Sequence, residues 1–448
     1  LVGSEMCIRD SPYLHEMGVD FIYLNPIFEA HSNHRYNTAD YLNVDPLLGT
    51  NEDFEALCTA AQKYGIGIVL DGVFSHTGSD SRYFNREGRY GEGGAYRDPN
   101  SPYRSWYDFD SKYKGGYRSW WGFETLPEVN EETPSFVEFI TGEGGVIDTW
   151  LRRGAAGFRL DVADELPDSF VMRLRNRIRA EKPDTLLIGE VWEDASNKIA
   201  YDCRRRYFTD RQLDSVMNYP LRDAILGFLN GGTAEHFAES MECIRENYPR
   251  DVFYNLMNVV GTHDTARALT LLGVTENEWK MDRNGRAHYQ LPPDRLEIAL
   301  RRLRMAAVIQ FTMPGSPTIY YGDEAGQQGF EDPFNRGTYP WGHENQELLA
   351  FYRKLCEIRA EEQTLADGDL QFSDTTASAL LRYERTSGDS RLVIVVNRGH
   401  QYAETKIDAL YALDLLSGEG FAYADPDGLI VSVPPETAYI LRCVNAAD

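Results

Sequence analysis

The chain has 448 residues, of which 42% are hydrophobic and 12% aromatic, and a formal net charge of −25. This length is enough for two or three domains with a large core, and the strongly acidic balance argues against nucleic acid or an anionic membrane surface as a partner. No apolar run approaches the ~18 residues of a membrane span, so a membrane-embedded protein is also excluded.

The first eleven residues are set apart from the fold. Met6-Cys7-Ile8-Arg9-Asp10 is encoded by ATG-TGT-ATA-AGA-GAC, which resembles the end of a transposon sequencing adapter. The segment has no signal-peptide anatomy. We therefore expect residues 1–11 to be non-native and the true N-terminus to be missing.

Residues 12–76 are predicted to contain the end of a helix, a strand near 19–24, a polar and aromatic loop, a second helix and a strand near 66–73. Thr50 and Asp53 have the spacing of a capping box at the start of the second helix. Apolar residues then recur at the helical spacing i, i+3, i+4, i+7, which predicts one buried face made of Phe54, Leu57, Cys58 and Ala61.

Residues 77–130 interrupt this alternation with glycine, aromatic and charged residues, as in Gly91-Glu92-Gly93-Gly94, Trp106-Tyr107 and Trp120-Trp121. A segment of this length without regular structure is unusual in a compact domain and is normally functional. The aromatic residues could stack on a ligand or hold a small domain together. We expect the second role for most of them.

Strand and helix patterns alternate again from 134 to about 362. Helices are predicted at 135–153, 166–181, 233–247, 294–311 and 345–361, and strands near 156–161, 186–191, 213–217, 257–262 and 317–321. After Gly368 the pattern changes to alternating strands such as 380–385 and 391–397. Turn signals at 387–389 and 426–428 separate them, which predicts a terminal all-β domain.

Four apolar runs end in acidic residues. Arg159 and Asp161 stand two apart, so on a strand their side chains project to the same face, and the guanidinium would keep the carboxylate ionised. Glu190 lies beside Trp192, a candidate apolar wall. His263-Asp264 ends the third run, and the fourth carries Asp71 and, five positions on, His76. In a closed parallel barrel such residues meet at the carboxyl ends of the strands.

These four stretches, in this order, resemble the signature regions of the α-amylase superfamily of retaining α-glucosidases. Residues 18–28 and 315–326 are similar to its second and last barrel strands. The resemblance implies a (β/α)8 TIM barrel whose first strand is missing here, with an inserted small domain after the third strand and a C-terminal antiparallel β-sandwich. The expected boundaries are 12–76 and 131–363 for the catalytic barrel, 77–130 for the insert and 368–448 for the sandwich.

The resemblance also implies roles for single residues. Asp161 would be the nucleophile and Glu190 the general acid/base, as the cleavage of an acetal with retention requires, and Asp264 would be the third carboxylate. Asp71 is expected to organise the site rather than to touch substrate. The expected substrate-binding residues are Tyr36, which would stack on the sugar at the cleavage point, and His76, Arg159, His263, Asp332 and Arg336.

Val162-Ala163-Asp164-Glu165 resembles the neopullulanase, cyclomaltodextrinase, maltogenic amylase and amylopullulanase group. We therefore expect a retaining α-glucan hydrolase that cleaves α-1,4 bonds of maltooligosaccharides, cyclodextrins, starch or pullulan. The resemblance leaves α-1,6 cleavage and transglycosylation open. One alternative is an α-glucanotransferase. Another is a non-catalytic binding subunit, which should lack some of the three carboxylates.

The six cysteines (Cys7, Cys58, Cys203, Cys243, Cys356 and Cys443) have no metal-like or disulfide-framework spacing, which favours free thiols in a reducing compartment. No cofactor is expected. The resemblance leaves calcium open, but the sequence contains no clear cluster of ligands for it. The expected partner is a neutral α-glucan, with a homodimer conceivable for the full-length protein. A cytoplasmic location is expected, and secretion stays open because the N-terminus is expected to be missing.

Overall fold

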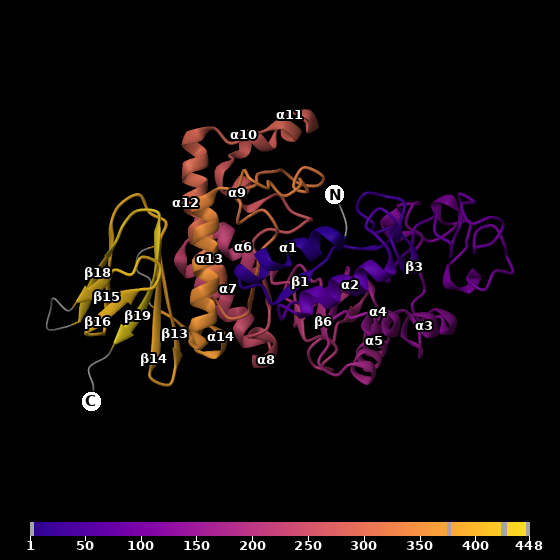
Figure 1. Cartoon of the computed structure of the whole chain (residues 1–448), viewed down its shortest axis with the longest axis horizontal. Coiled ribbons are helices and arrows are strands. Elements are labelled where there is room, and N and C mark those ends of the chain that lie inside the picture. Colours follow the sequence, from indigo (N-terminus) through magenta and orange to yellow (C-terminus); the bar gives the residue numbers. More distant parts are fainter. Residues whose placement is uncertain (1–3, 374–377, 423–427, 445–448) are drawn as a thin grey trace. The chain divides into compact units, whose positions relative to one another are not determined.

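The computed structural model describes residues 4–373, 378–422 and 428–444, with side chains from residue 10 onward. The chain divides into two compact units, which end and begin at Val216 and Met217. Each unit is described by itself below, and Figure 1 gives the labels of the elements.

The first unit is built on a parallel sheet of five strands in the order β1-β4-β5-β6-β9. Its strands are β1 (Phe21–Tyr23), β4 (Gly67–Gly72), β5 (Gly157–Leu160), β6 (Leu186–Gly189) and β9 (Ser215–Val216). All five fall inside the predicted ranges. The strands β4 and β5 are almost wholly buried, as continuous apolar runs in a parallel sheet should be.

Crossover helices α2 (Asn51–Gln62) and α5 (Asp168–Glu181) connect the strands. The capping box is confirmed, because the Thr50 side chain accepts from the Asp53 N–H while the Asp53 side chain accepts from the Thr50 N–H. The predicted apolar face of α2 is confirmed as well, since all four of its residues are buried.

The amino end is helical. Helix α1 (Ser4–Glu16) runs without a break across the boundary expected after residue 11. Among the described residues β1 is therefore the first strand of the chain, and Leu1–Gly3 lie outside the described residues. Pro12 lies inside this helix, where it removes one backbone donor.

The helical pattern predicted over 135–153 is confirmed for most of its length, but it is divided into two helices. The structure has two helices, α3 (Pro134–Thr141) and α4 (Val146–Arg152), separated by a glycine-rich turn. Gly144 has φ of +74°, and a Cβ on Gly142 would lie 2.3 Å from the Glu138 carbonyl oxygen. A side chain would clash at Gly142 and would strain the backbone at Gly144, so the chain turns here although the apolar periodicity continues.

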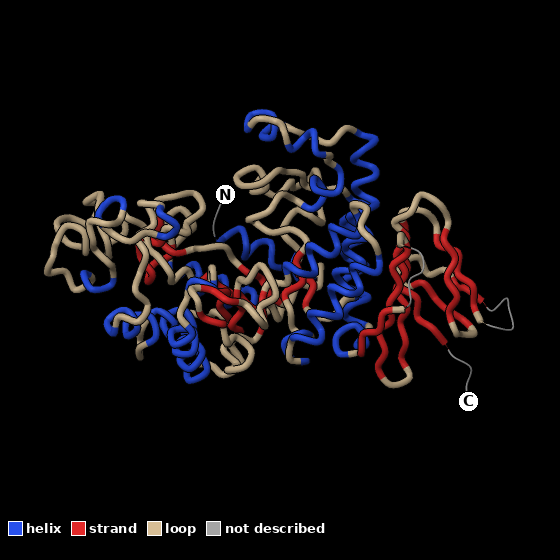
Figure 2. The backbone as a smooth tube through the Cα atoms, turned by 180° about the vertical axis from the view of Figure 1, so that it is seen from behind, coloured by secondary structure: helices blue, strands red, loops and turns tan. Residues whose placement is uncertain are grey.

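The segment 77–130 is mostly loop, as Figure 2 shows, with three short 3-10 helices: η1 (Arg104–Trp106), η2 (Lys114–Gly116) and η3 (Trp120–Gly122). Tyr83, Phe84, Trp106 and Tyr117 are buried and pack in tilted pairs, Tyr83 against Trp106 and Phe84 against Tyr117, which agrees with a structural role for most aromatic residues here. The segment returns to the sheet through an antiparallel bridge between His76 and Glu128. The remaining strands of the unit are the short pairs β2 (Phe28–Ala30) with β3 (Thr38–Val44), and β7 (Ile199–Ala200) with β8 (Cys203–Arg204).

The second unit contains a parallel pair, β10 (Met257–Val259) and β11 (Ser316–Thr318), which matches the last two predicted strands. Its helices are α6 (Tyr219–Leu229), α7 (Ala234–Asn247), α8 (Arg250–Phe253), α9 (Ala268–Gly273), α10 (Glu276–Trp279), α11 (Arg283–His288), α12 (Pro293–Thr312), α13 (Gln346–Glu361) and α14 (Gln363–Asp367). Helix α6 was not predicted. None of the helices in the described part of the chain is long and apolar enough to span a membrane.

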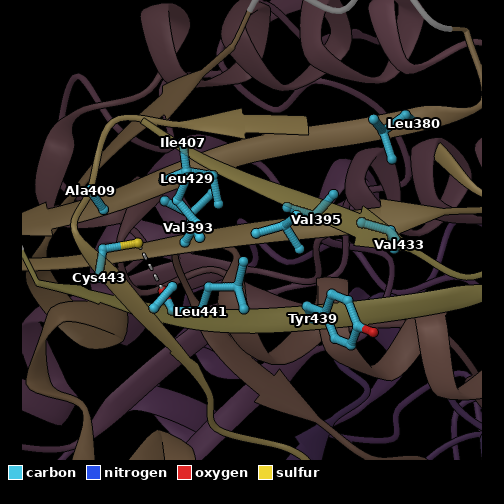
Figure 3. Packing of buried hydrophobic residues seen from close by; sticks show 12 residues of the cluster. Leu380, Val393, Val395, Ile407, Ala409, Leu429, Val433, Tyr439, Leu441 and Cys443 are labelled. Atoms are coloured by element: carbon cyan, nitrogen blue, oxygen red, sulfur yellow. Dashed lines mark hydrogen bonds between the residues drawn. The ribbon is translucent and has the colours of Figure 1, made fainter. Parts of the chain in front are cut away.

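The carboxyl end of this unit is all-β, as predicted. One antiparallel sheet has the order β12-β13-β14-β19-β16-β17 and a second pairs β15 with β18. Buried side chains such as Val393, Val395 and Leu441 pack between them (Figure 3). The predicted turn at 387–389 connects β13 to β14, whereas most of the turn at 426–428 lies outside the described residues. The strands are β12 (Asp369–Phe372), β13 (Leu380–Ser387), β14 (Ser390–Asn397), β15 (Ala403–Ile407), β16 (Tyr411–Asp414), β17 (Gly420–Ala422), β18 (Leu429–Val433) and β19 (Thr437–Val444).

Candidate active site

The first unit carries a buried arginine surrounded by carboxylates at the carboxyl ends of β4, β5 and β6. Arg159 is fully buried, and its Nη1 donates to Asp71 Oδ1 at 2.7 Å and to Asp161 Oδ1 at 2.9 Å. Its Nη2 lies 2.8 Å from Glu190 Oε2, but no N–H is aimed along that contact, so the contact is ionic. The predicted pairing of Arg159 with Asp161 is confirmed.

Strand register explains why these groups meet. Asp71 on β4 and Arg159 on β5 are direct partners in the parallel ladder, and Ile188 continues the same row on β6. Partners in a ladder project to the same face of the sheet. Asp161 and Glu190 follow β5 and β6 directly, so both carboxylates emerge at the same edge as the guanidinium.

Asp71 ties two tyrosines to this arginine. Its Oδ2 accepts from the Tyr23 hydroxyl at 2.5 Å and from the Tyr36 hydroxyl at 3.0 Å. Burial raises the pKa of Asp71, and Arg159 opposes that shift. Because Nη1 lies within 3.0 Å of both carboxyl oxygens, we assign the ionised form. These contacts agree with the organising role predicted for Asp71, and they bring Tyr36 into the cluster.

The Glu190 carboxyl group is held at both oxygens. Oε1 accepts from the Trp192 indole N–H at 3.1 Å, and Oε2 accepts from the Val162 backbone N–H at 2.8 Å. Trp192 was predicted to form an apolar wall, and the structure gives it a different role. Trp192 is 43% exposed, and its indole N–H donates a hydrogen bond to the Glu190 carboxylate two positions back in the chain.

His76 is buried beside this cluster. Its Nε2 lies 3.0 Å from the Tyr36 carbonyl oxygen, and its Nδ1 lies 3.0 Å from Ser75 Oγ. Since a carbonyl oxygen can only accept, Nε2 carries the proton. Burial lowers the pKa of His76 to about 4, so the imidazole is neutral at physiological pH. Its ring also faces Trp120, with a centroid distance of 5.5 Å.

The second unit brings together the other four predicted site residues. His263 Nε2 lies 3.1 Å from Asp264 Oδ2, and Arg336 Nη2 lies 3.6 Å from Asp264 Oδ1. Arg336 also forms an ion pair with Asp332 at 2.9 Å. Asn335, which the sequence did not single out, is fully buried and donates to the His263 carbonyl oxygen at 2.7 Å, so it fixes the loop that carries the acid.

The second unit also contains a buried ion pair, Arg267 with Asp323, that was not predicted from the sequence. Arg267 donates to Asp323 Oδ1 at 3.1 Å and to the Tyr321 carbonyl oxygen at 2.7 Å. Burial raises the pKa of Asp323 to about 6, although Arg267 opposes this. The acid stands in the stretch 315–326 that resembles the last barrel strand, which was the only signal available.

No group of three or more His, Cys, Asp or Glu side chains in the described residues is arranged to hold a metal ion. The question of calcium therefore stays as the sequence left it. Cys58, Cys203, Cys243, Cys356 and Cys443 are free thiols.

Chemically, the first unit provides two carboxyl groups that share the Arg159 guanidinium and differ in their other contacts. Asp161 Oδ1 is paired with the guanidinium, and Glu190 is held by an indole N–H and a backbone N–H. Two carboxylates at neighbouring strand ends can divide the tasks of nucleophile and proton donor.

Comparison with known proteins identifies the family. The model of the α-amylase catalytic domain matches residues 7–340. The chain is 37% identical to an amylopullulanase of Thermoanaerobacter thermohydrosulfuricus over 94% of this chain and 30% of that protein. It is 32% identical to a cyclomaltodextrinase of Geobacillus thermopakistaniensis, over 97% of this chain and 69% of that protein. The chain spans only 25% to 36% of the length of three amylopullulanases that it matches.

Solved structures agree. The cyclic α-maltosyl-(1→6)-maltose hydrolase of Arthrobacter globiformis superposes with a TM-score of 0.79 at 26% identity, covering 98% of this chain and 89% of that one. The debranching enzyme of Nostoc punctiforme gives a TM-score of 0.81 at 28% identity with the same coverage. The predicted fold class, a TIM-barrel catalytic domain followed by a C-terminal antiparallel sheet, is therefore confirmed. The chain belongs to the α-amylase family of glycoside hydrolases.

Proposed function

We propose that this chain is the catalytic part of a retaining α-glucan hydrolase that cleaves α-1,4-glucosidic bonds. The observation that carries the proposal is the position of Arg159 between Asp161 and Glu190 at the ends of two adjacent strands. The names of the relatives, amylopullulanase and cyclomaltodextrinase, support starch-like and cyclic α-glucans as the substrate class.

In the proposed reaction Glu190 donates its proton to the glycosidic oxygen while Asp161 attacks the anomeric carbon. The bond to the leaving sugar breaks, and a glycosyl ester forms on Asp161. Glu190, now a carboxylate, then takes a proton from water, which attacks the same carbon and frees Asp161. Arg159 keeps the nucleophile anionic between turnovers, because it forms an ion pair with it in a buried site.

The remaining roles rest on the resemblance. Tyr36 would stack on the sugar at the cleavage point, with its hydroxyl anchored to Asp71. Asp264 would be the third carboxylate and would grip sugar hydroxyls. The other four proposed substrate contacts are His76, His263, Asp332 and Arg336.

The test separates the two catalytic roles. We expect Asp161→Asn and Glu190→Gln each to abolish hydrolysis of maltooligosaccharides while the circular dichroism spectrum stays that of the wild type. Glu190→Ala should still cleave substrates with activated leaving groups, which need little protonation, whereas Asp161→Ala should not. Near-wild-type turnover of maltooligosaccharides by either amide variant would refute the assignment.

A further inference from the structure

The residue that follows the proposed nucleophile has an unusual backbone. Val162 is in the left-handed region, with φ of 37° and ψ of 59°. For a β-branched side chain this conformation is a genuine outlier, because the Cβ substituents crowd the neighbouring carbonyl. Such outliers persist only where the surrounding structure fixes them, and they cluster at functional sites.

The conformation directs successive peptide groups at one residue. The Val162 N–H donates to Glu190 Oε2 at 2.8 Å, and the Ala163 N–H donates to the Glu190 main-chain oxygen at 3.2 Å. The Glu190 N–H in turn donates to the Leu160 oxygen at 3.0 Å. The backbone N–H, the backbone carbonyl and the carboxyl group of Glu190 are therefore all held by residues 160–163.

A plain turn does not account for this arrangement. A strand that turns into the 3-10 helix η4 (Ala163–Glu165) could use glycine in the left-handed position without strain. Such a turn would also have no need of a side-chain acceptor 28 residues away in sequence. Towards β4, the Asp161 N–H donates to the Gly72 oxygen at 3.2 Å. The backbone at Val162 is therefore held by hydrogen bonds to both neighbouring strand ends, that of β4 and that of β6.

We infer that the Val162 peptide N–H is a positioning group that orients the Glu190 carboxyl group for proton transfer to the leaving oxygen. This inference rests on the proposed function. Together with the Trp192 N–H on Oε1, the Val162 N–H on Oε2 fixes the plane of the carboxyl group. Because Val162 directly follows Asp161, the same turn sets the nucleophile and the proton donor relative to each other.

The experiment removes one hydrogen-bond donor, the Val162 N–H, from the backbone. The α-hydroxy analogue of valine is introduced at position 162, which converts the 161–162 amide into an ester without an N–H. The probe is a series of aryl α-maltosides with leaving groups of increasing basicity. We expect kcat/KM to fall about 10- to 100-fold for the poorest leaving group, since the lost bond is to a carboxyl group that becomes charged as it gives up its proton in the transition state. For the best leaving group, which needs little proton donation, we expect a fall of less than about threefold.

Two controls isolate the effect. An ester at position 163 removes the neighbouring N–H, which bonds a main-chain carbonyl, so any loss should be equal for all leaving groups. Val162→Gly keeps the N–H and fits the left-handed backbone, so its dependence on the leaving group should match that of the wild type.

Three outcomes decide between the possibilities. A 162 ester with the wild-type dependence on the leaving group would overturn the inference, as would a Val162→Gly variant that shows the steep dependence. If the 162 ester does not fold, Val162→Gly can still overturn the inference, because a steep dependence in a variant that keeps the N–H would show that the N–H is not what orients Glu190. A wild-type chain that cleaves none of the aryl maltosides would instead refute the proposed function itself.

Discussion

Asp71 offers a quantitative test of how the site is held together. The change is Asp71→Ala, which removes the acceptor of the Tyr23 hydroxyl, the Tyr36 hydroxyl and Arg159 Nη1 in one step. Asp71 and Arg159 form an ion pair, and both side chains are fully buried, with 0% exposure. Removing one partner of a buried ion pair costs about 3–5 kcal/mol, because the other charge loses its compensation.

Two features of the structure adjust that magnitude. Arg159 keeps Asp161 and Glu190 as neighbours, which places the ion-pair cost near the lower end of the range. Two hydroxyl groups lose an acceptor, and each contributes about 1 kcal/mol. We therefore expect Asp71→Ala to lower the free energy of unfolding of the first unit by about 5 kcal/mol.

The assay is urea unfolding followed by tryptophan fluorescence, with Asp71→Asn as the matched control. Asparagine keeps one oxygen that can accept a hydrogen bond from a tyrosine. We therefore expect Asp71→Asn to lower the free energy of unfolding by about half as much as Asp71→Ala. A loss below about 1 kcal/mol for Asp71→Ala, comparable to an ordinary surface substitution, would refute this account of the buried network.

Three further predictions concern other parts of the molecule. Thr50→Ala should lower the free energy of unfolding by about 1 kcal/mol through loss of the α2 cap, measured by the same urea titration. The control is Thr209, an exposed threonine in a turn that caps no helix, and an equal effect from Thr209→Ala would contradict the prediction. His76 has a pKa lowered to about 4, so its neutral form stabilises the fold above the unfolded value of 6.5 and that stability is lost as the pH falls from 6.5 towards 4. Melting temperatures should fall over this window, and less so for His76→Asn. Cyclodextrin should be cleaved at a rate comparable to soluble starch or faster, measured as reducing ends released, whereas inhibition by cyclodextrin with rapid internal cleavage of starch would indicate a conventional endo-amylase.

Patterns that depend on one element were predictable from the sequence. The i, i+2 spacing of Arg159 and Asp161 fixed their common face once the strand was recognised, and the pair is observed. The cap of α2 depends only on Thr50 and Asp53 and was likewise found. The break between α3 and α4 was missed because apolar periodicity continues through it, although the glycines around Gly144 were the available signal.

Contacts that depend on register between strands were not predictable. Nothing in the local sequence aligns Asp71 with Arg159, since that alignment is set by the packing of β4 on β5. The same holds for the Val162 N–H, whose partner Glu190 directly follows the neighbouring strand β6. Trp192 shows the opposite error, because its proximity to Glu190 was expected but its role was misjudged. An aromatic ring near a carboxyl group can act as a wall or as a donor, and only geometry distinguishes the two.

The central claim is that Asp161 is the nucleophile of a retaining reaction, and trapping the covalent intermediate tests it most directly. The chain would be incubated with an α-maltosyl fluoride carrying a second fluorine on the reacting ring, which slows hydrolysis of the glycosyl-enzyme, and then digested and analysed by mass spectrometry. We predict one added fluoromaltosyl group, on the peptide that contains Asp161, with activity lost in step with labelling. A label on a different carboxylate, or loss of activity without any covalent label, would contradict the claim.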